Sequence, residues 1–265
     1  MNSIDFAPSS RPLKLAAVVA LSAAAWAAAG AHAEGVGGLG MEGSPLTVGL
    51  GVGWVHKGYV GVGNKTTVLP LLHYENRWVD IGIPKIDLKL YSTRALSLRL
   101  RLRYANDGYK GSDSYFLNGM ADRHASFWAG GAVVVRNPYF TTKAELLGDA
   151  SGNSKGTRAK LEFSRRFQVG SVGLTPALSL RWFNGKYVNY YYGVLPDETR
   201  PWRPAYDPGA TTNVGLGLTA DYALTRRSTL LMKLQYVRLG SAIQDSPLVD
   251  ATSQHGLFVG WAYRY

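Results

Sequence analysis

Hydrophobic and polar side chains alternate strictly along residues 96–104. Leucine occupies every second position up to Tyr104, and the intervening positions hold a serine and three arginines, Arg99, Arg101 and Arg103. Because successive side chains of a β-strand point to opposite faces, this pattern predicts a strand with one apolar and one strongly cationic face. A soluble sandwich would alternate in the same way, so this strand alone leaves the fold class open.

The same period of two recurs through the chain, and no segment shows helical periodicity with caps. Many of the segments have nine or more residues, the length that a tilted strand needs to cross the hydrocarbon of a membrane. The predicted strands are twelve in number: 46–54, 66–74, 78–83, 86–91, 96–104, 125–135, 139–147, 157–167, 172–183, 212–224, 229–239 and 255–265.

Short and long connections alternate between these strands. Short turns are predicted at 75–77, 93–95, 136–138, 168–171 and 225–227, and longer loops at 55–65, 106–123, 148–156, 184–211 and 240–254. Outer-membrane barrels have short periplasmic turns and long external loops. The pattern therefore predicts an all-β protein, a single transmembrane antiparallel β-barrel with both termini in the periplasm.

The strand number depends on residues 77–92, which as one long strand would give eleven. Pro84 cannot donate a ladder hydrogen bond, so we expect the chain to turn there, which restores twelve. Ten strands remain open if one weak hairpin lies outside the wall.

The N-terminal segment has the features of a secretory signal peptide. A basic start precedes an Ala-rich apolar run of ~15 residues, shorter than the ~20 that span a bilayer. Ala31 and Ala33 form the small-x-small pattern before a cleavage site. We therefore expect a signal peptide at 1–33, a flexible mature N-terminus at 34–45 and an outer-membrane barrel at 46–265 of a Gram-negative bacterium.

Composition adds little chemistry. In a cytosolic protein the net charge of +11 would suggest a nucleic-acid-binding function. An exported chain is expected to meet outer-membrane lipids and lipopolysaccharide instead. Cysteine is absent, and the histidines show no metal-ligand spacing, so no metal, cofactor or nucleic-acid site is predicted. Asp122 and His124 form a possible dyad, but an anchor for the long loop explains them better. The chain is therefore not expected to be an enzyme.

The arginine stripe, Arg99, Arg101 and Arg103, is the most informative polar feature. Arginine at the bilayer midplane costs ~2–4 kcal/mol, so these side chains must face the lumen if their leucine partners face lipid. One reading is an anion-selective pore. The other, which a small filled barrel favours, is a structural network with the acids Asp80, Asp87, Glu145 and Glu162.

Aromatic residues mark two further features. Some are expected to form girdles at the membrane interfaces: Trp54, Tyr74, Trp78, Trp128, Trp182 and Trp261. Others surround prolines in the largest external loop, as a binding surface or as a plug folded into the barrel mouth: Tyr187, Tyr190, Tyr191, Tyr192, Trp202 and Tyr206.

The C-terminal strand resembles the assembly signal of bacterial outer-membrane barrels, because Trp261, Tyr263 and a final Tyr265 alternate after Gly260. Further blocks carry a resemblance to the MipA/OmpV family of MltA-interacting outer-membrane proteins: 68–71, 117–123, 191–194, 203–209, 238–240, 245–249 and 260–265. One block departs from the family pattern, since 57–61 keeps Tyr59 and Gly61 but lacks the usual proline.

The resemblance implies an outer-membrane barrel without shared catalytic residues. For the founding member it implies a scaffold joining a lytic murein transglycosylase to a bifunctional penicillin-binding protein. We therefore expect a non-enzymatic scaffold in cell-wall remodelling. The alternatives are a narrow channel for small, including anionic, solutes and a surface adhesin that uses the aromatic loop.

Overall fold

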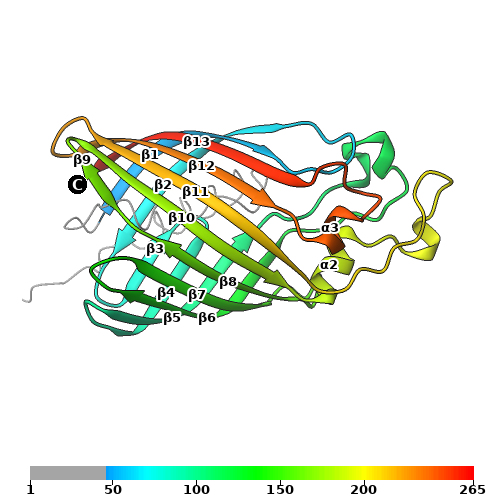
Figure 1. Ribbon diagram of the computed structural model, residues 1–265, viewed down its shortest axis with the longest axis horizontal. Coiled ribbons are helices and arrows are strands. Elements are labelled where there is room, and N and C mark those ends of the chain that lie inside the picture. The colour runs from blue at the N-terminus through cyan, green and yellow to red at the C-terminus, as the bar shows by residue number, and fades with distance from the viewer. Residues whose placement is uncertain (1–45) are drawn as a thin grey trace, which may run out of the picture.

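The computed structural model describes residues 46–265, and the predicted signal peptide (1–33) and mature N-terminus (34–45) lie outside this range. The described chain is one antiparallel sheet with short helices in its connections (Figure 1). The strands are β1 (Leu46–His56), β2 (Lys65–Glu75), β3 (Val79–Gly82), β4 (Lys85–Ser92), β5 (Leu96–Ala105), β6 (Ser126–Arg136), β7 (Thr141–Asp149), β8 (Thr157–Ser164), β9 (Phe167–Val169), β10 (Val172–Phe183), β11 (Thr211–Ala223), β12 (Ser228–Arg238) and β13 (Ser253–Arg264).

The sheet closes on itself to form a barrel. β1 pairs with β2 on one side and with β13 on the other, in a register running from Thr47 opposite Arg264 to His56 opposite His255. β10 pairs with both β8 and β11, so the circle has no free end. The first and last described strands therefore start and finish at the same end of the barrel. By the rule of short periplasmic turns, this is the periplasmic end.

The wall has twelve strands, as the sequence predicts. β8 and β9 both pair with β10 in one continuous register, and the break between them lies opposite Pro176, which has no N–H to donate. The chain also turns at Pro84, between β3 and β4, rather than forming one long strand over 77–92. β3 and β4 therefore count as two strands of the wall, and β8 and β9 together count as one, which gives twelve.

The β3–β4 hairpin is much shorter than its neighbours. Only three register pairs join β2 to β3, from His73 opposite Gly82 to Glu75 opposite Asp80, whereas ten join β1 to β2. The Ile83–Pro84 turn therefore lies part-way up the wall, and the upper part of β2 extends beyond it.

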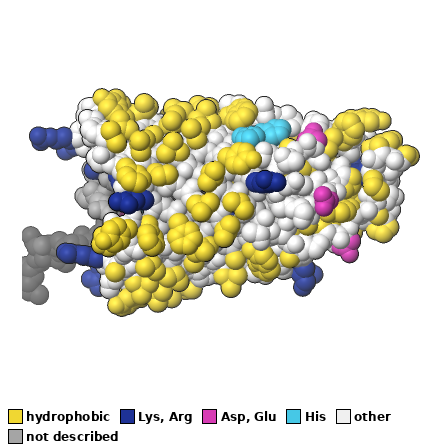
Figure 2. Space-filling model, viewed as in Figure 1, with side chains coloured by type: hydrophobic (Ala, Val, Ile, Leu, Met, Phe, Trp, Pro, Cys, Tyr) yellow, Lys and Arg dark blue, Asp and Glu magenta, His cyan; other side chains and the backbone are white. Residues whose placement is uncertain are grey.

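The faces of the wall are the reverse of those of a soluble sandwich. Leu50, Leu100 and Leu216 are 61%, 49% and 56% exposed on the outside, whereas Arg99 and Asp87 are 6% and 0% exposed inside. Figure 2 shows apolar side chains spread over the outer surface between the two ends. Within residues 46–265, none of the helices has the length and apolarity needed to span a bilayer. The strands are thus the elements that meet the membrane.

One predicted girdle aromatic is wrong. Trp78, Trp182 and Trp261 are 57%, 40% and 44% exposed on the outer face, as interface residues should be. Trp128 instead points into the lumen, is fully buried, and packs against Tyr187 with ring centroids 5.6 Å apart. Trp128 lies two residues after Ser126 and four before Ala132 on β6, so it shares their inner face.

One side of the lumen is apolar, and two glycines there make room for an aromatic ring. The Phe258 ring lies over Gly51 of β1 and Gly260 of β13, where a Cβ atom would overlap with it. Leu69 packs against the same ring, and Leu71, Leu231 and Ala262 form a small cluster beside it. Glycine is therefore required at these two inward positions to admit one aromatic side chain.

We predict that Gly51→Leu lowers the free energy of unfolding by about 1–3 kcal/mol, because a new side chain must displace the Phe258 ring. Urea unfolding of the detergent-folded protein, followed by tryptophan fluorescence, measures the change. Gly131→Leu is the matched control, since a Cβ there meets nothing within 4 Å. Equal stability of the two variants would contradict this account of the lumen.

Candidate functional site

The three arginines of β5 all point into the lumen and each meets a carboxylate. Arg99 Nη1 lies 2.6 Å from Asp80 Oδ2, and Arg101 Nη2 lies 2.7 Å from Asp87 Oδ2. Arg103 Nη2 lies 3.2 Å from Glu145 Oε2, which also pairs with Arg101. The structure therefore joins the stripe to three of the acids that the sequence suggested.

Lysines extend this network along the wall. Lys85 Nζ lies 3.2 Å from both Asp80 and Asp87, and Lys160 Nζ lies 2.6 Å from Glu162. Buried ion pairs tolerate desolvation only when partners are in place, and each of these three acids pairs with at least one cation. Positive charge still predominates. Among buried strand side chains, eight are cationic (Lys85, Lys89, Arg99, Arg101, Arg103, Arg158, Lys160, Arg181) and five acidic (Asp80, Asp87, Glu145, Glu162, Asp221).

The external mouth is filled by a plug of loop residues. Its largest part is α2 (Gly185–Tyr192), which begins where the Asn184 side chain accepts a hydrogen bond from Tyr187 N–H. The other short helices of these loops are η1 (Gly111–Asp113), η2 (Tyr115–Leu117), η3 (Pro196–Glu198) and α3 (Ser241–Gln244). Figure 1 shows α2 and α3 gathered at the end opposite the C-terminus.

Aromatic packing ties the plug to the wall. Tyr187 stacks on Phe183 of β10 with ring centroids 4.3 Å apart, and Tyr192 stacks on Tyr59 of the first loop at 5.4 Å. The Tyr59 hydroxyl donates to the Tyr191 carbonyl at 3.2 Å. Burial raises the pKa of Tyr59 well above 10, so the hydroxyl stays neutral. Loops far apart in the sequence thus share one apolar core.

The six aromatic residues predicted in the largest loop divide into two groups. Tyr187, Tyr191 and Tyr192 are buried in the plug, and Tyr190 and Tyr206 pack partly against it. Trp202 alone is largely exposed, at 48%. The plug reading of this loop therefore describes five of these six side chains.

A small cavity lies beneath the plug. A cavity of about 30 Å³ lies among residues that include Lys57, Asp107, Arg158 and Arg181, enough for about two water molecules. Lys57 closes it from one side by donating to the Asn106 and Gly108 carbonyls at 2.9 and 3.0 Å. The described loops therefore close the lumen toward the outside.

The remaining predicted sites have structural surroundings. Asp122 accepts a hydrogen bond from Gly111 N–H at 2.8 Å, which anchors the loop between β5 and β6. In the C-terminal strand, Trp261, Tyr263 and Tyr265 form a row with successive ring centroids 6.2 and 5.2 Å apart. Trp261 Nε1 donates to Ser228 Oγ of β12 at 2.6 Å, which fixes this row against the neighbouring strand.

The periplasmic end carries a rim of exposed arginines. They lie in or beside the turns and at the β8–β9 break, and the turns themselves, 76–78, 93–95, 137–140, 165–166, 170–171 and 224–227, contain no Asp or Glu. The opposite end carries several exposed aspartates, and Figure 2 shows basic side chains near the C-terminus and acidic ones toward the other end. We call these residues the arginine rim: Arg77, Arg94, Arg136, Arg165, Arg226 and Arg227.

Sequence reasoning missed two features. The arginine rim was visible as arginine in four of the short turns, but the turns were compared by length and not by charge. The second is a group formed by His73 and Glu75 of β2 with Asp80 of β3. The spacing His73-x-Glu75 places two ligand types on one strand face. The third member required the register that sets Glu75 opposite Asp80.

Comparison with known proteins decides the family. The family model described as MltA-interacting protein MipA matches residues 48–265, which is nearly all of the described barrel. The chain belongs to this family. It is therefore an outer-membrane protein, in agreement with the names of its relatives and with its barrel fold.

Two curated relatives of this MipA-family chain cover most of its length, and a third covers less than half. The putative outer membrane protein YiaT of Escherichia coli K12 is 25% identical over 225 residues, 84% of this chain and 92% of that protein. The MltA-interacting protein of the same strain is 26% identical over 240 residues, 89% and 92%. OmpV of Vibrio cholerae is 29% identical over 117 residues, 44% and 46%.

Solved structures with a similar fold include outer-membrane channels. The NanC porin gives a TM-score of 0.44 at 9% identity and covers 82% of this chain and 100% of its own. An outer membrane channel from Pseudomonas putida F1 gives 0.43 at 11% identity, covering 86% and 98%. At such TM-scores neither likeness bears on function, and the barrel rests on the closed ladder of this chain.

We predict that Asp87→Asn lowers the free energy of unfolding by about 3–5 kcal/mol, because the fully buried carboxylate serves Lys85, Arg99 and Arg101 together. Removing it leaves buried cations short of counter-charge. Urea unfolding in detergent measures the loss, with Asp197→Asn in an exposed loop as the control. A loss under about 1 kcal/mol would mean that the network is solvated and not a structural element.

We predict that Lys57 makes stability rise between pH 8 and 10.5. Burial lowers its pKa from 10.5 to about 8. In this interval the unfolded state binds more protons than the folded state, so the free energy of unfolding increases with pH. Urea unfolding of the parent and of Lys57→Met across this range isolates the contribution. If the free energy of unfolding changes with pH in the same way in both proteins, Lys57 makes no such contribution.

Proposed function

We propose that this chain is a non-enzymatic outer-membrane scaffold that holds a lytic murein transglycosylase, together with a penicillin-binding protein, at its periplasmic end. The observation that carries the proposal is the arginine rim, an exposed basic surface whose turns contain no acidic residue. A relative that covers 89% of this chain is named for interaction with MltA. The plugged external mouth supports a binding role over a transport role.

The rim suits a partner with a negatively charged docking surface. Basic charge spread around one end of a barrel raises the rate of encounter with an acidic surface, and salt screens this effect. Arginine also pairs with carboxylates through two parallel hydrogen bonds, which fixes orientation. Tyr139 lies in one of these turns at 68% exposure, so an aromatic anchor accompanies the charge.

We predict that replacing Arg94, Arg136, Arg226 and Arg227 by glutamine weakens binding of a purified lytic transglycosylase at least about tenfold, mainly through the association rate. Surface plasmon resonance at several salt concentrations, with the mature protein in detergent, measures both rates. The matched control replaces three exposed external lysines, Lys110, Lys155 and Lys186, by glutamine. Equal binding by the two variants would assign docking to another surface.

A ternary capture tests the linking role separately. Immobilised barrel loaded with the transglycosylase should retain a penicillin-binding protein that the unloaded barrel or the transglycosylase alone retains less well. Retention that is equal in all three cases would reduce the proposal to a two-component complex.

A narrow anion channel is the second candidate, and the excess of buried positive charge in the lumen favours it. Planar bilayers distinguish the two functions. A channel requires the plug to move, so deletion of 187–206 should raise anion-selective conductance and leave capture by the arginine rim unchanged. A variant without the plug that stays non-conducting would eliminate the channel.

A further inference from the structure

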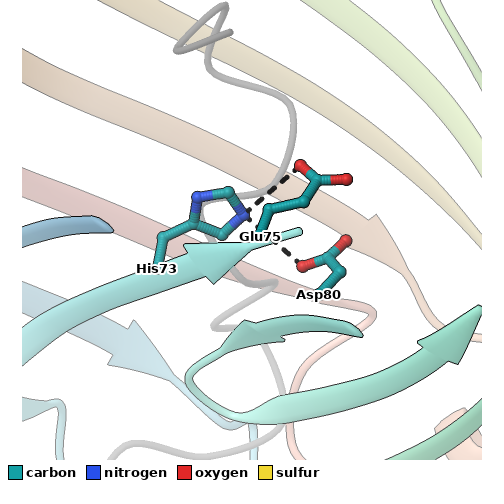
Figure 3. A group of neighbouring side chains, drawn as sticks. All are labelled: His73, Glu75 and Asp80. Carbon is teal, nitrogen blue, oxygen red and sulfur yellow. Dashed lines mark ion pairs between the residues drawn. The ribbon is translucent and has the colours of Figure 1, made fainter. Parts of the chain in front are cut away.

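Three potential metal ligands meet on the inner wall near the periplasmic end. His73 and Glu75 come from β2 and Asp80 from the adjacent β3, and the imidazole points toward both carboxylates (Figure 3). One ligand atom of each residue lies within 4.8 Å of the other two. Asp80 also belongs to the lumen network through Lys85 and Arg99, but the proposed scaffold role makes no use of the group.

The separation of His73 from Asp80 is one that two ligands of a common ion would have. His73 Nε2 lies 3.4 Å from Asp80 Oδ1 and 3.9 Å from Glu75 Oε2. Both His73 Nε2 and Asp80 Oδ1 are buried, yet neither has a hydrogen-bond partner among the described residues. Two ligands about 2.0–2.2 Å from a tetrahedral zinc ion lie roughly 3.3–3.6 Å apart. The nitrogen and the oxygen are thus spaced as ligands of one ion.

The carboxylates divide their oxygens between two tasks. Asp80 Oδ2 pairs with Lys85 and Arg99 at 3.2 and 2.6 Å, which leaves Oδ1 facing His73. Glu75 Oε1 pairs with Lys89 at 2.6 Å, which leaves Oε2 facing the same point. The surrounding cations hold both groups ionised and oriented, as outer-shell partners of metal ligands do.

An ion can reach this group from the periplasm. The Glu75 side chain is 40% exposed at the end of β2, whereas those of His73 and Asp80 are 8% and 5% exposed. The ligand group therefore has one solvent-facing member and two buried ones. This gives an entry path and a partly dry interior.

We propose that His73, Glu75 and Asp80 form a binding site for a divalent transition-metal ion of the zinc class. One imidazole and two carboxylates are borderline and hard donors that suit zinc, cobalt and similar ions. Three protein ligands leave a fourth position for water, so the ion is exchangeable and not sealed in.

A bound ion also joins the two strands with the shortest ladder. β2 and β3 share only three register pairs, and these include Glu75 opposite Asp80 and His73 opposite Gly82. Coordination by both strands adds a cross-link at this position. Metal binding is therefore expected to stabilise the folded barrel as any ligand of the native state does.

A single-histidine background gives the sharpest test. The other histidines of residues 46–265, His56, His124 and His255, are replaced by alanine, and the mature protein is purified through a tag without histidine. Zn²⁺ is titrated by calorimetry, and Co²⁺ by the visible absorption bands of tetrahedral coordination. We expect one saturable equivalent. His73→Ala or Asp80→Asn should weaken it more than about a hundredfold, since outer-shell changes alone cost 10–100-fold.

Lys89→Gln separates a built site from incidental binding. Removing the partner that orients Glu75 through Oε1 should weaken Zn²⁺ binding about tenfold or more, whereas binding elsewhere would not respond. Folding of each variant is checked by the faster migration of folded barrels on unheated gels. If the background protein shows no saturable binding, the group is an ion-pair cluster only. The same conclusion follows if Asp80→Asn or Lys89→Gln leaves the affinity unchanged.

Discussion

Inside a bilayer each unpaired backbone N–H or C=O costs several kcal/mol, so a sheet that crosses it cannot keep a free edge. In this chain the constraint is met where β1 pairs with β13 over ten residues. Closure then determines the position of every side chain, because alternate residues must face lipid or lumen. The leucines of β5 take the lipid side, and its arginines have no place except the interior.

The charged interior follows from that division. Three arginines, with Lys85 and Lys160, are buried where water is scarce, and Asp80, Asp87, Glu145 and Glu162 are arranged among them. The aromatic plug has the opposite chemistry and occupies the external mouth, where loops rather than strands supply the side chains. The barrel thus has a charged middle, an apolar outer closure and a basic periplasmic rim.

Alternation was sufficient to predict the strands and the inward arginines, and the missing N–H of Pro84 predicted the turn there, because each depends on residues close in sequence. Trp128 was misplaced because aromatic residues serve both membrane interfaces and buried cores, and its partner Tyr187 lies 59 positions away. The same limit left the plug as one of two readings of the largest loop, because its core joins residues from four loops. The group at His73 needed the β2–β3 register, which alternation alone cannot give.

The short β3–β4 hairpin makes the barrel mechanically uneven. Elsewhere neighbouring strands are held by long ladders, but at the Ile83–Pro84 turn the upper part of β2 continues without β3 beside it. Backbone opening needs fewest broken hydrogen bonds here, so amide hydrogens near this turn should exchange before those of β12 and β13. The wall is therefore easiest to open between β2 and β3, and the ion pairs of Asp80 oppose this opening.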